Sequence, residues 1–177
     1  MTTAADLIVI GGGNAGITAA REGARQGACT VLVQDGPPGG ECTFSGCVPS
    51  KALLAVAAVG GSWADARQAI DRSISTIAAT EDAAALGREH IEVLDGRATL
   101  RSGSKISVDG ALVRASQIAL ATGSSPVVPS IPGLDGIDVL TNESVFHLDR
   151  QPASMVILGG ARSAARWPKR SPGSAPR

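Results

Sequence analysis

Aromatic residues and net charge are both scarce in this sequence. Its 177 residues include two Phe, two Trp and no Tyr, and 16 Lys and Arg balance 16 Asp and Glu. Proteins that bind nucleic acid usually need a basic face and aromatic rings on which bases can stack. The composition therefore argues against a nucleic-acid partner.

Long hydrophobic runs and a dense set of cysteines are missing as well. Nowhere do 18 apolar residues follow one another, which argues against a spanning helix and a membrane partner. The N-terminal MTTAADLIVI has no basic residue ahead of its apolar stretch, unlike a secretory signal. Three cysteines are too few, and odd in number, for a secreted disulfide scaffold. We therefore expect a cytoplasmic protein.

Glycine, in contrast, is abundant, and three glycines form the pattern Gly11-x-Gly13-x-x-Gly16. An apolar run at 6–10, expected to be a buried parallel strand, precedes them, and an alanine-rich stretch at 17–26, expected to be a helix, follows. In this context the pattern is typical of dinucleotide binding, because its glycines permit a tight turn, backbone approach to a pyrophosphate and close helix–strand packing. The helix N-terminus then faces the phosphate charge. A glycine-rich turn without a ligand is the alternative.

A second strand at 30–33 completes a βαβ unit, and Gly27 stands where the helix is expected to end. In dinucleotide-binding units a carboxylate about 20 residues after the glycines usually binds the ribose hydroxyls. Here the strand ends in Gln34-Asp35. Gln34 is the preferred candidate because its amide can hydrogen-bond a hydroxyl, and Asp35 is the alternative.

The rest of the chain predicts a glycine- and proline-rich loop at 36–50, followed by further helices and strands. The expected helices are 51–59 and 63–87. The expected strands are a small antiparallel meander of 91–94, 97–100, 105–108 and 111–113, then a buried strand at 117–121 that ends at Thr122-Gly123, and a last strand at 155–158.

Cys42 and Cys47 lie in the predicted loop. On a regular helix two residues five apart are separated by a rise of about 7.5 Å, whereas a disulfide needs Cα atoms roughly 4.4–6.8 Å apart. A bridge therefore needs irregular backbone, which Gly46 can provide. Two structural thiols or a metal pair are the alternatives, but no second cysteine pair is present and His90 and His147 are isolated, so no metal site is expected. A redox pair is favoured beside a dinucleotide-binding unit, since a dithiol carries two electrons, as flavins and nicotinamides do.

These motifs together resemble the flavoprotein (pyridine nucleotide-) disulfide oxidoreductase family, class I, which includes dihydrolipoamide dehydrogenase, glutathione reductase and mercuric reductase. The resemblance rests on GGGNAG at 11–16, on GGECTFSGCVPSK at 39–51, on ATGS at 121–124 and on VILGG at 156–160.

The resemblance implies an α/β fold, namely a Rossmann-type FAD-binding domain with a parallel sheet, a three-layer ββα arrangement and a small antiparallel meander. FAD would lie with its pyrophosphate at Gly13-Asn14 and its ribose at Gln34. The implied cofactor-binding residues are Gly11, Gly13, Asn14, Gly16, Gln34, Lys51, Ala98, Thr122 and Gly123.

The implied activity is that of an oxidoreductase acting on a sulfur group, or of a mercuric reductase. By the resemblance, NAD(P)H reduces the flavin, the flavin reduces the disulfide of Cys42 and Cys47, and the electrons pass to a small disulfide or metal-ion substrate. Cys47 would be the sulfur next to the flavin and Cys42 the interchange thiol, while Lys51 would stabilise the negatively charged reduced flavin. Members of the family are homodimers.

The resemblance also implies a truncated chain, since the family's NAD(P) domain and dimer-interface domain would follow. We expect an incomplete FAD-binding domain at 1–150, the first strand of an NAD(P)-binding domain at 151–160 and a disordered basic tail at 161–177. That tail has five Lys and Arg, three Pro and no acidic residue, a composition typical of a gene read out of frame. The alternative to an active enzyme is a catalytically inactive remnant that at most binds FAD weakly.

Overall fold

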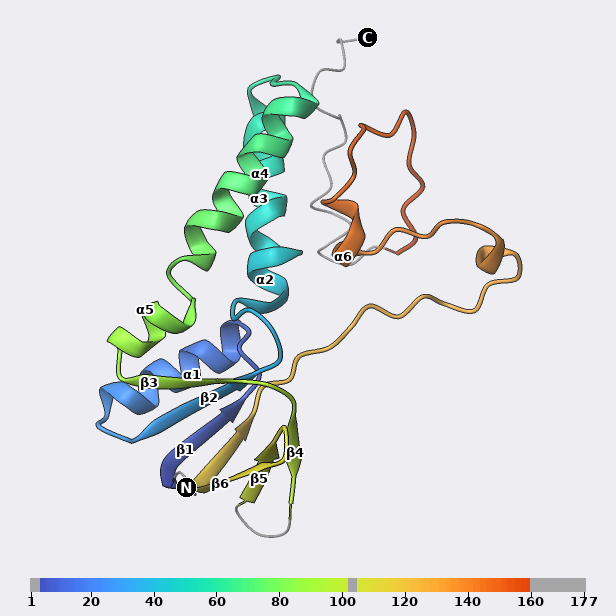
Figure 1. Cartoon of the computed structure of the whole chain (residues 1–177). Coiled ribbons are helices and arrows are strands. Elements are labelled where there is room, and N and C mark those ends of the chain that lie inside the picture. The colour runs from blue at the N-terminus through green and yellow to red at the C-terminus, as the bar shows by residue number, and fades with distance from the viewer. Residues whose placement is uncertain (1–3, 102–104, 160–177) are drawn as a thin grey trace. The chain divides into compact units, whose positions relative to one another are not determined.

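The computed structural model describes residues 4–101 and 105–159, and the chain divides into two compact units (Figure 1). Unit 1 comprises residues 1–40 and 77–124, and unit 2 comprises residues 41–76 and 125–177. The predicted basic tail at 161–177 lies outside the described residues. No helix in the described part of the chain is long and apolar enough to cross a membrane.

Unit 1 is built on one six-stranded sheet with the order β3-β2-β1-β6-β5-β4. Strands β3, β2, β1 and β6 run parallel to one another, whereas β6, β5 and β4 are antiparallel. The strands are β1 (Ala4–Ile10), β2 (Thr30–Gln34), β3 (Ile91–Asp95), β4 (Ala98–Leu100), β5 (Lys105–Val108) and β6 (Ala111–Leu120).

Three layers form because successive residues of a buried strand point to opposite faces of the sheet. Val9 and Leu32 pack with helices α1 (Asn14–Arg25) and α5 (Ala83–Arg88) on one face. Ile8 packs with residues of β5 and β6, the meander, on the other face. The predicted α/β class and the layer of antiparallel strands are confirmed, and Figure 1 shows α1 and α5 beside the parallel strands.

The meander differs from its prediction in its number of strands. The segment expected as its first strand, 91–94, instead pairs in parallel with β2 as β3. The segments expected as two separate strands, 111–113 and 117–121, form the single strand β6, which pairs with β5 through its first half and with β1 through its second half. A single strand that pairs with one strand along its first half and with another along its second half cannot be recognised from hydrophobic alternation alone. The reason is that the two halves have different patterns of burial. The second half is also less buried than predicted.

Helix α1 ends as its sequence predicts. Gly27 has a φ of +84° and its N–H donates to the carbonyl of Ala24, while the N–H of Ala28 donates to the carbonyl of Gly23 at 3.1 Å. These two bonds form a Schellman motif, which favours glycine at the left-handed position. The helix begins at Asn14, three residues before the predicted start, because the glycine loop itself supplies its first turn.

Unit 2 contains a helical hairpin and a mostly irregular segment. Its elements are α2 (Gly40–Phe44), α3 (Cys47–Ala58), α4 (Trp63–Ala78), the 3₁₀ turn η1 (Leu134–Gly136) and α6 (Asn142–Val145). Leu53 of α3, Ile70 of α4 and Phe146 after α6 belong to one buried apolar cluster. The guanidinium of Arg67 donates to the carbonyl of Leu148 at 3.0 Å, which holds the chain after α6 against α4.

Three predicted boundaries are wrong. The predicted loop at 36–50 contains α2 and the start of α3, because Pro49 lies in the first turn of α3, where the missing N–H costs no hydrogen bond. The predicted helix at 63–87 is two helices, since Asp82 caps a new one by accepting the N–H of Ala85 at 2.7 Å. Residues 155–158 are not a strand, because no described strand lies beside them to share a hydrogen-bonded ladder.

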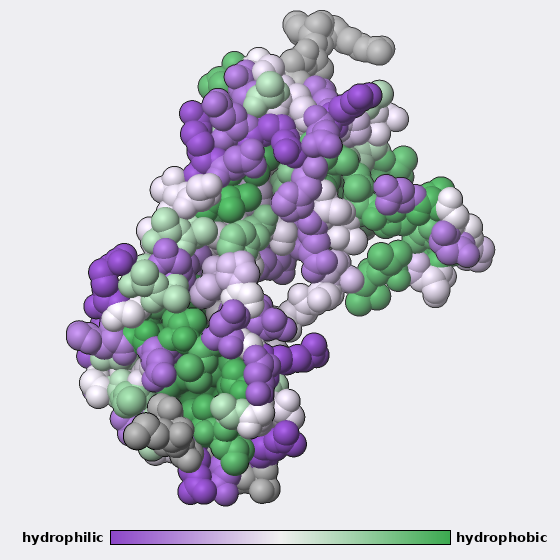
Figure 2. All heavy atoms as spheres, viewed as in Figure 1, coloured by the Kyte–Doolittle hydropathy of each residue, from purple (hydrophilic) through white to green (hydrophobic). Residues whose placement is uncertain are grey.

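The irregular chain of unit 2 exposes many large apolar side chains. Apolar surface gathers over this part of the molecule in Figure 2. The exposed residues are Val127, Val128, Ile131, Ile137, Leu140, Val156, Ile157 and Leu158.

One ion pair fastens α1 to the end of α5. The guanidinium of Arg21 donates from Nε to Glu89 at 2.8 Å and from Nη2 to the same carboxylate and to the carbonyl of Thr80. The hydrogen bond from Arg21 lowers the pKa of Glu89, and the same hydrogen bond raises the pKa of Arg21.

We predict that Glu89→Gln lowers the free energy of unfolding at pH 7 by up to about 1 kcal/mol, since the pair is partly exposed. Because the pKa of Glu89 is lower in the folded state, its contribution is present above the ordinary carboxyl value and is lost as the pH falls through the lowered value. Urea denaturation at pH 7 and pH 3 measures this difference. Glu92→Gln, at an exposed position on β3, is the control, and an equal loss for both variants contradicts the prediction.

Candidate functional site

The loop that follows β1 packs so closely against neighbouring backbone that no side chain fits at Gly11 or Gly16. Gly11 has a φ of +107°, and a Cβ there would overlap the carbonyl oxygen of Ala121. A Cβ on Gly16 would overlap the carbonyl oxygen of Gly11. Glycine is therefore required at both positions, because a larger side chain would clash with backbone. The first turn of α1 and the chain after β6 pack directly against the loop there.

The N-terminus of α1 is open to an anion. Its N-cap is Gly13, which supplies no side-chain hydrogen bond, and the first turn contains no acidic residue. The N-terminal N–H groups of a helix without such a cap carry a partial positive charge and attract phosphate. Asn14, the first residue of the helix, is exposed beside them. A cradle of bare glycine backbone at an uncapped helix start therefore fits the pyrophosphate of FAD.

Gln34 closes the loop from the end of β2. Its Oε1 accepts the N–H of Gly12 at 2.5 Å, and its Nε2 donates to the carbonyl of Asp35 at 2.8 Å. A Cβ on Gly12 would lie 3.1 Å from the Gln34 side chain, so this glycine also leaves room for it. One lone pair and one N–H of the Gln34 amide remain for a ribose hydroxyl, and this contact stays a prediction. Asp35, the alternative candidate, is exposed.

The paired glycines ahead of the cysteines, Gly39 and Gly40, pack against the loop that follows β1. The sequence motifs did not indicate this contact. The N–H of Gly39 donates to the carbonyl of Gly12 at 2.7 Å, and Gly39 pairs with Gly13 in an isolated parallel bridge. A Cβ on Gly40 would lie 2.7 Å from the Cα of Gly13. Two glycine runs more than 20 residues apart in the sequence therefore pack backbone against backbone, and a pair of adjacent glycines is the only local signal of this contact.

The remaining predicted residues of unit 1 lie near the same ends of the strands. Thr122 and Gly123 are exposed directly after β6, and a Cβ on Gly11 would lie 3.0 Å from the Thr122 nitrogen. Ala98 is half-buried at the start of β4, two residues after Gly96, whose N–H donates to the carbonyl of Gln34 at 2.9 Å. The carboxyl ends of parallel strands are where open α/β sheets bind ligands.

Cys42 and Cys47 lie on either side of a helix break in unit 2. Cys42 belongs to α2, and Cys47 is the first residue of α3, with Gly46 between the helices at φ −132° and ψ −106°. A Cβ on Gly46 would lie 3.4 Å from the Cα of Cys42, so the chain folds back on the first cysteine. Both residues are half-buried and are not joined by a disulfide in this structure. The irregular backbone expected around Gly46 is confirmed.

Lys51 lies one turn after Cys47 on α3 and is exposed. Residues four apart occupy the same face of a helix, so the cation and the second cysteine share a face. The start of α3 is a position where the helix dipole favours negative charge. The helix therefore offers two sources of positive potential on the side of Cys47.

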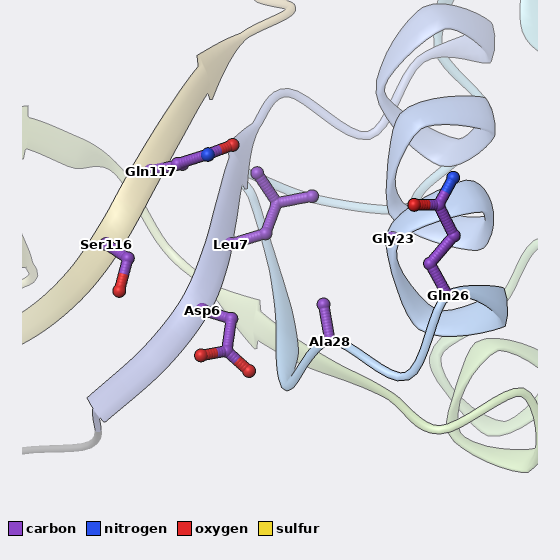
Figure 3. A pocket seen from close by; sticks show the side chains of 7 residues that line it. All are labelled: Asp6, Leu7, Gly23, Gln26, Ala28, Ser116 and Gln117. Atoms are coloured by element: carbon purple, nitrogen blue, oxygen red, sulfur yellow. The ribbon is translucent and has the colours of Figure 1, made fainter.

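A shallow hollow at the opposite end of the strands is not part of this arrangement (Figure 3). Asp6 and Leu7 of β1 and Ser116 and Gln117 of β6 are among the residues that line it (Figure 3). It lies at the amino ends of the parallel strands, away from the glycine loop. Among the described residues no group of three or more His, Cys, Asp or Glu side chains could hold a metal ion.

We predict that Gly16→Ala destabilises unit 1 by about 3 kcal/mol or prevents its folding, because the added methyl group overlaps the Gly11 carbonyl. Gly87→Ala is the matched control, since Gly87 is also helical and a Cβ there meets no atom within 4 Å. We expect the control to be neutral or to stabilise the chain by roughly 0.5–1 kcal/mol. Denaturant unfolding followed by circular dichroism compares the two, and equal stabilities contradict the packing argument.

Comparison with known proteins agrees with this geometry. The sequence profile described as pyridine nucleotide-disulphide oxidoreductase matches residues 5–165. A glutathione reductase from Burkholderia cepacia is 32% identical, covering 92% of this chain and 39% of the relative. A mercuric reductase from Streptomyces lividans is 36% identical, covering 89% and 38%. A dihydrolipoyl dehydrogenase from Chlorobaculum tepidum is also 36% identical, covering 88% and 38%.

The fold comparison agrees as well. The structure of the Cu(II) complex of the HOCl-induced flavoprotein disulfide reductase RclA from Escherichia coli matches with a TM-score of 0.73 and 26% identity, covering 81% of this chain and 34% of that chain. This chain thus spans 38–39% of the length of the three curated relatives. Enzymes of the matched family use FAD and NAD(P)H. With both the glycine loop and the cysteine segment inside the matched region, the chain belongs to the pyridine nucleotide-disulphide oxidoreductase family, class I.

Proposed function

We propose that this chain is the FAD-binding and disulfide-bearing part of an FAD-dependent, NAD(P)H-linked oxidoreductase that reduces a disulfide or a metal ion. The observation that carries the proposal is the combination of an uncapped helix start over bare glycine backbone with a cysteine pair placed at a helix break. The first feature suits a pyrophosphate, and the second suits a disulfide that opens and closes. The family's use of FAD and NAD(P)H supports the combination.

In this proposal the residues of unit 1 bind and orient the cofactor. Amide groups at Gly13 and Asn14 receive the pyrophosphate, Gln34 receives the ribose, and Thr122 and Gly123 contact the flavin half. FAD supplies a two-electron carrier between NAD(P)H and the cysteines. The rigid glycine loop keeps the anion-binding amides in place before the cofactor arrives, so little ordering is needed on binding.

The cysteines then transfer the two electrons by thiol–disulfide exchange. With a disulfide substrate, the thiolate of Cys42 attacks one substrate sulfur and releases the first thiol of the substrate. The thiolate of Cys47 next attacks the sulfur of Cys42, which releases the second substrate thiol and restores the disulfide within the chain. Each exchange breaks one S–S bond and forms one. Lys51 contributes positive charge on the face that carries Cys47.

The proposed substrate class is taken from the named relatives, which include a glutathione reductase and a mercuric reductase. We propose either a small disulfide or a metal ion, with a homodimer as the assembly and the cytoplasm as the location. The exposed apolar chain of unit 2 supports a further protein surface against it. Residues 151–160 are proposed as the entry to an NAD(P)-binding domain, which follows the FAD-binding domain at 1–150.

The second candidate is a chain that binds FAD weakly and turns over no NAD(P)H. The 177 residues correspond to 38–39% of the length of the curated relatives. Oxidation of NADH or NADPH by the FAD-loaded chain, followed at the nicotinamide absorption band, distinguishes the two candidates. Sustained oxidation excludes the second candidate, and FAD binding without oxidation supports it.

We predict that Gly13→Asp weakens FAD binding at least ~10-fold while the fold is kept or stabilised. A Cβ on Gly13 has its nearest neighbour at 3.9 Å, and the backbone there is extended, so a side chain fits. An N-cap aspartate stabilises a helix by about 1 kcal/mol but places a negative charge where the pyrophosphate would bind. Gly13→Asn, which caps the helix without a charge, is the matched control. Calorimetric titration with FAD measures both, and equal affinities for the two variants contradict a phosphate site.

We also predict that mild oxidation with oxidised glutathione removes two of the three thiols of the chain and forms one bond between Cys42 and Cys47. Cys29→Ser keeps this bond, because Cys29 lies in unit 1 outside the segment. Cys42→Ser and Cys47→Ser each abolish it. Mass spectrometry of alkylated peptides identifies the linkage, and a bond that involves Cys29, or none at all, contradicts the proposed redox pair.

A further inference from the structure

The residue immediately before the first cysteine, Glu41, is tied to a distant part of unit 2. Its Oε1 accepts a hydrogen bond from Nδ2 of Asn142 at 3.1 Å, across a separation of 101 residues in the sequence. Glu41 lies in the first turn of α2 and its side chain is exposed, whereas Asn142 is half-buried as the first residue of α6. The carboxylate is therefore held by a partner from another element.

Asn142 is itself well anchored. Helix α6 has a capping box, in which Thr141 accepts the N–H of Glu143 at 3.2 Å and Ser144 accepts the N–H of Thr141 at 3.0 Å. Phe146, directly after the helix, is buried in the apolar cluster of unit 2. The amide that holds Glu41 is thus fixed by both local and core contacts.

Glu41 also lies where the two cysteine-bearing helices meet. Its carbonyl oxygen accepts the N–H of Ser45 at 2.9 Å, and a Cβ on Gly46 would lie 2.9 Å from the same oxygen. Cys42 follows Glu41 directly, and Cys47 follows Gly46. The carboxylate belongs to the residue that adjoins Cys42, and a negative charge there interacts unfavourably with a thiolate of the pair, but hardly at all with a neutral disulfide.

We propose that Glu41, positioned by Asn142, favours the oxidised form of the cysteine pair and so lowers its reduction potential. Reduction breaks the S–S bond between Cys42 and Cys47, takes up two electrons and two protons and yields two thiols. The Glu41 charge disfavours the thiolate form of these thiols, which the disulfide lacks. This inference rests on the proposed redox role of the pair.

Equilibration of the full chain with mixtures of reduced and oxidised glutathione at pH 8 tests the proposal. Acid quenching, alkylation and mass spectrometry give the fraction of the Cys42–Cys47 disulfide and hence the equilibrium constant for its reduction. We expect Glu41→Gln to raise this constant about three- to tenfold, the effect of one nearby charge in a well-solvated site. Asn142→Ala is expected to raise it less, because the charge remains but is no longer held.

Glu143→Gln is the matched control, since it removes one charge from an exposed position of α6 whose side chain is not the one bonded to Glu41. We expect its constant to equal that of the wild type. The rate of thiol alkylation by iodoacetamide is expected to rise in Glu41→Gln, which a merely structural role of Glu41 would not produce. Circular dichroism verifies that each variant is folded.

The outcomes separate this inference from the proposed function. If the wild-type chain forms the disulfide but Glu41→Gln leaves its equilibrium constant unchanged, the role of Glu41 is overturned and the redox pair is not. An equal change in Glu41→Gln and Glu143→Gln has the same meaning. A wild-type chain that forms no disulfide between Cys42 and Cys47 overturns the proposed function, and the inference with it.

Discussion

Close packing of bare backbone around the glycine loop is the constraint on which unit 1 depends. The carbonyl of Gly11 occupies the space that a side chain on Gly16 would need, and the carbonyl of Ala121 occupies the space next to Gly11. Through these contacts one loop fixes the start of α1 and the end of β6 at the same time. Gln34 adds the end of β2 by accepting the Gly12 N–H. The three strand ends that would surround a dinucleotide are therefore set by sterics before any ligand binds.

The same packing explains why this loop is suited to an anion. Side chains are absent from the glycine positions of the loop, and the uncapped start of α1 presents the N–H groups of its first turn together with the helix dipole. The backbone then continues through Gly39, bonded to Gly12, into Gly40, which contacts Gly13 and begins α2. The glycines that pack on the loop are thus followed at once by the segment with the cysteines, and only Glu41 lies between Gly40 and the first cysteine.

The arrangement of the two cysteines depends on a break in regular helix between them. Gly46 interrupts the helix so that Cys42 and Cys47 are not held at helical separation, and Pro49 is accommodated because the new helix starts just before it. Around the pair, charges of both signs are placed by different elements, namely Lys51 on α3 and Glu41 held from α6. Since thiolates respond to nearby charge and neutral disulfides do not, such placement can adjust a redox pair without altering its geometry.

The sequence by itself determined the local features: the glycine turn, α1 with its Gly27 ending, the first two strands and the need for irregular backbone at Gly46. Each follows from short-range spacing, because φ angles, helix caps and buried faces are set within a few residues. Only the tertiary structure decided that one long strand serves both the parallel sheet and the meander, that the Gln34 amide bonds Gly12, and that Asn142 holds Glu41. The two side-chain hydrogen bonds join residues 22 and 101 positions apart, and β6 pairs with β1 across 110 positions. Such pairings depend on how whole elements pack rather than on any local pattern.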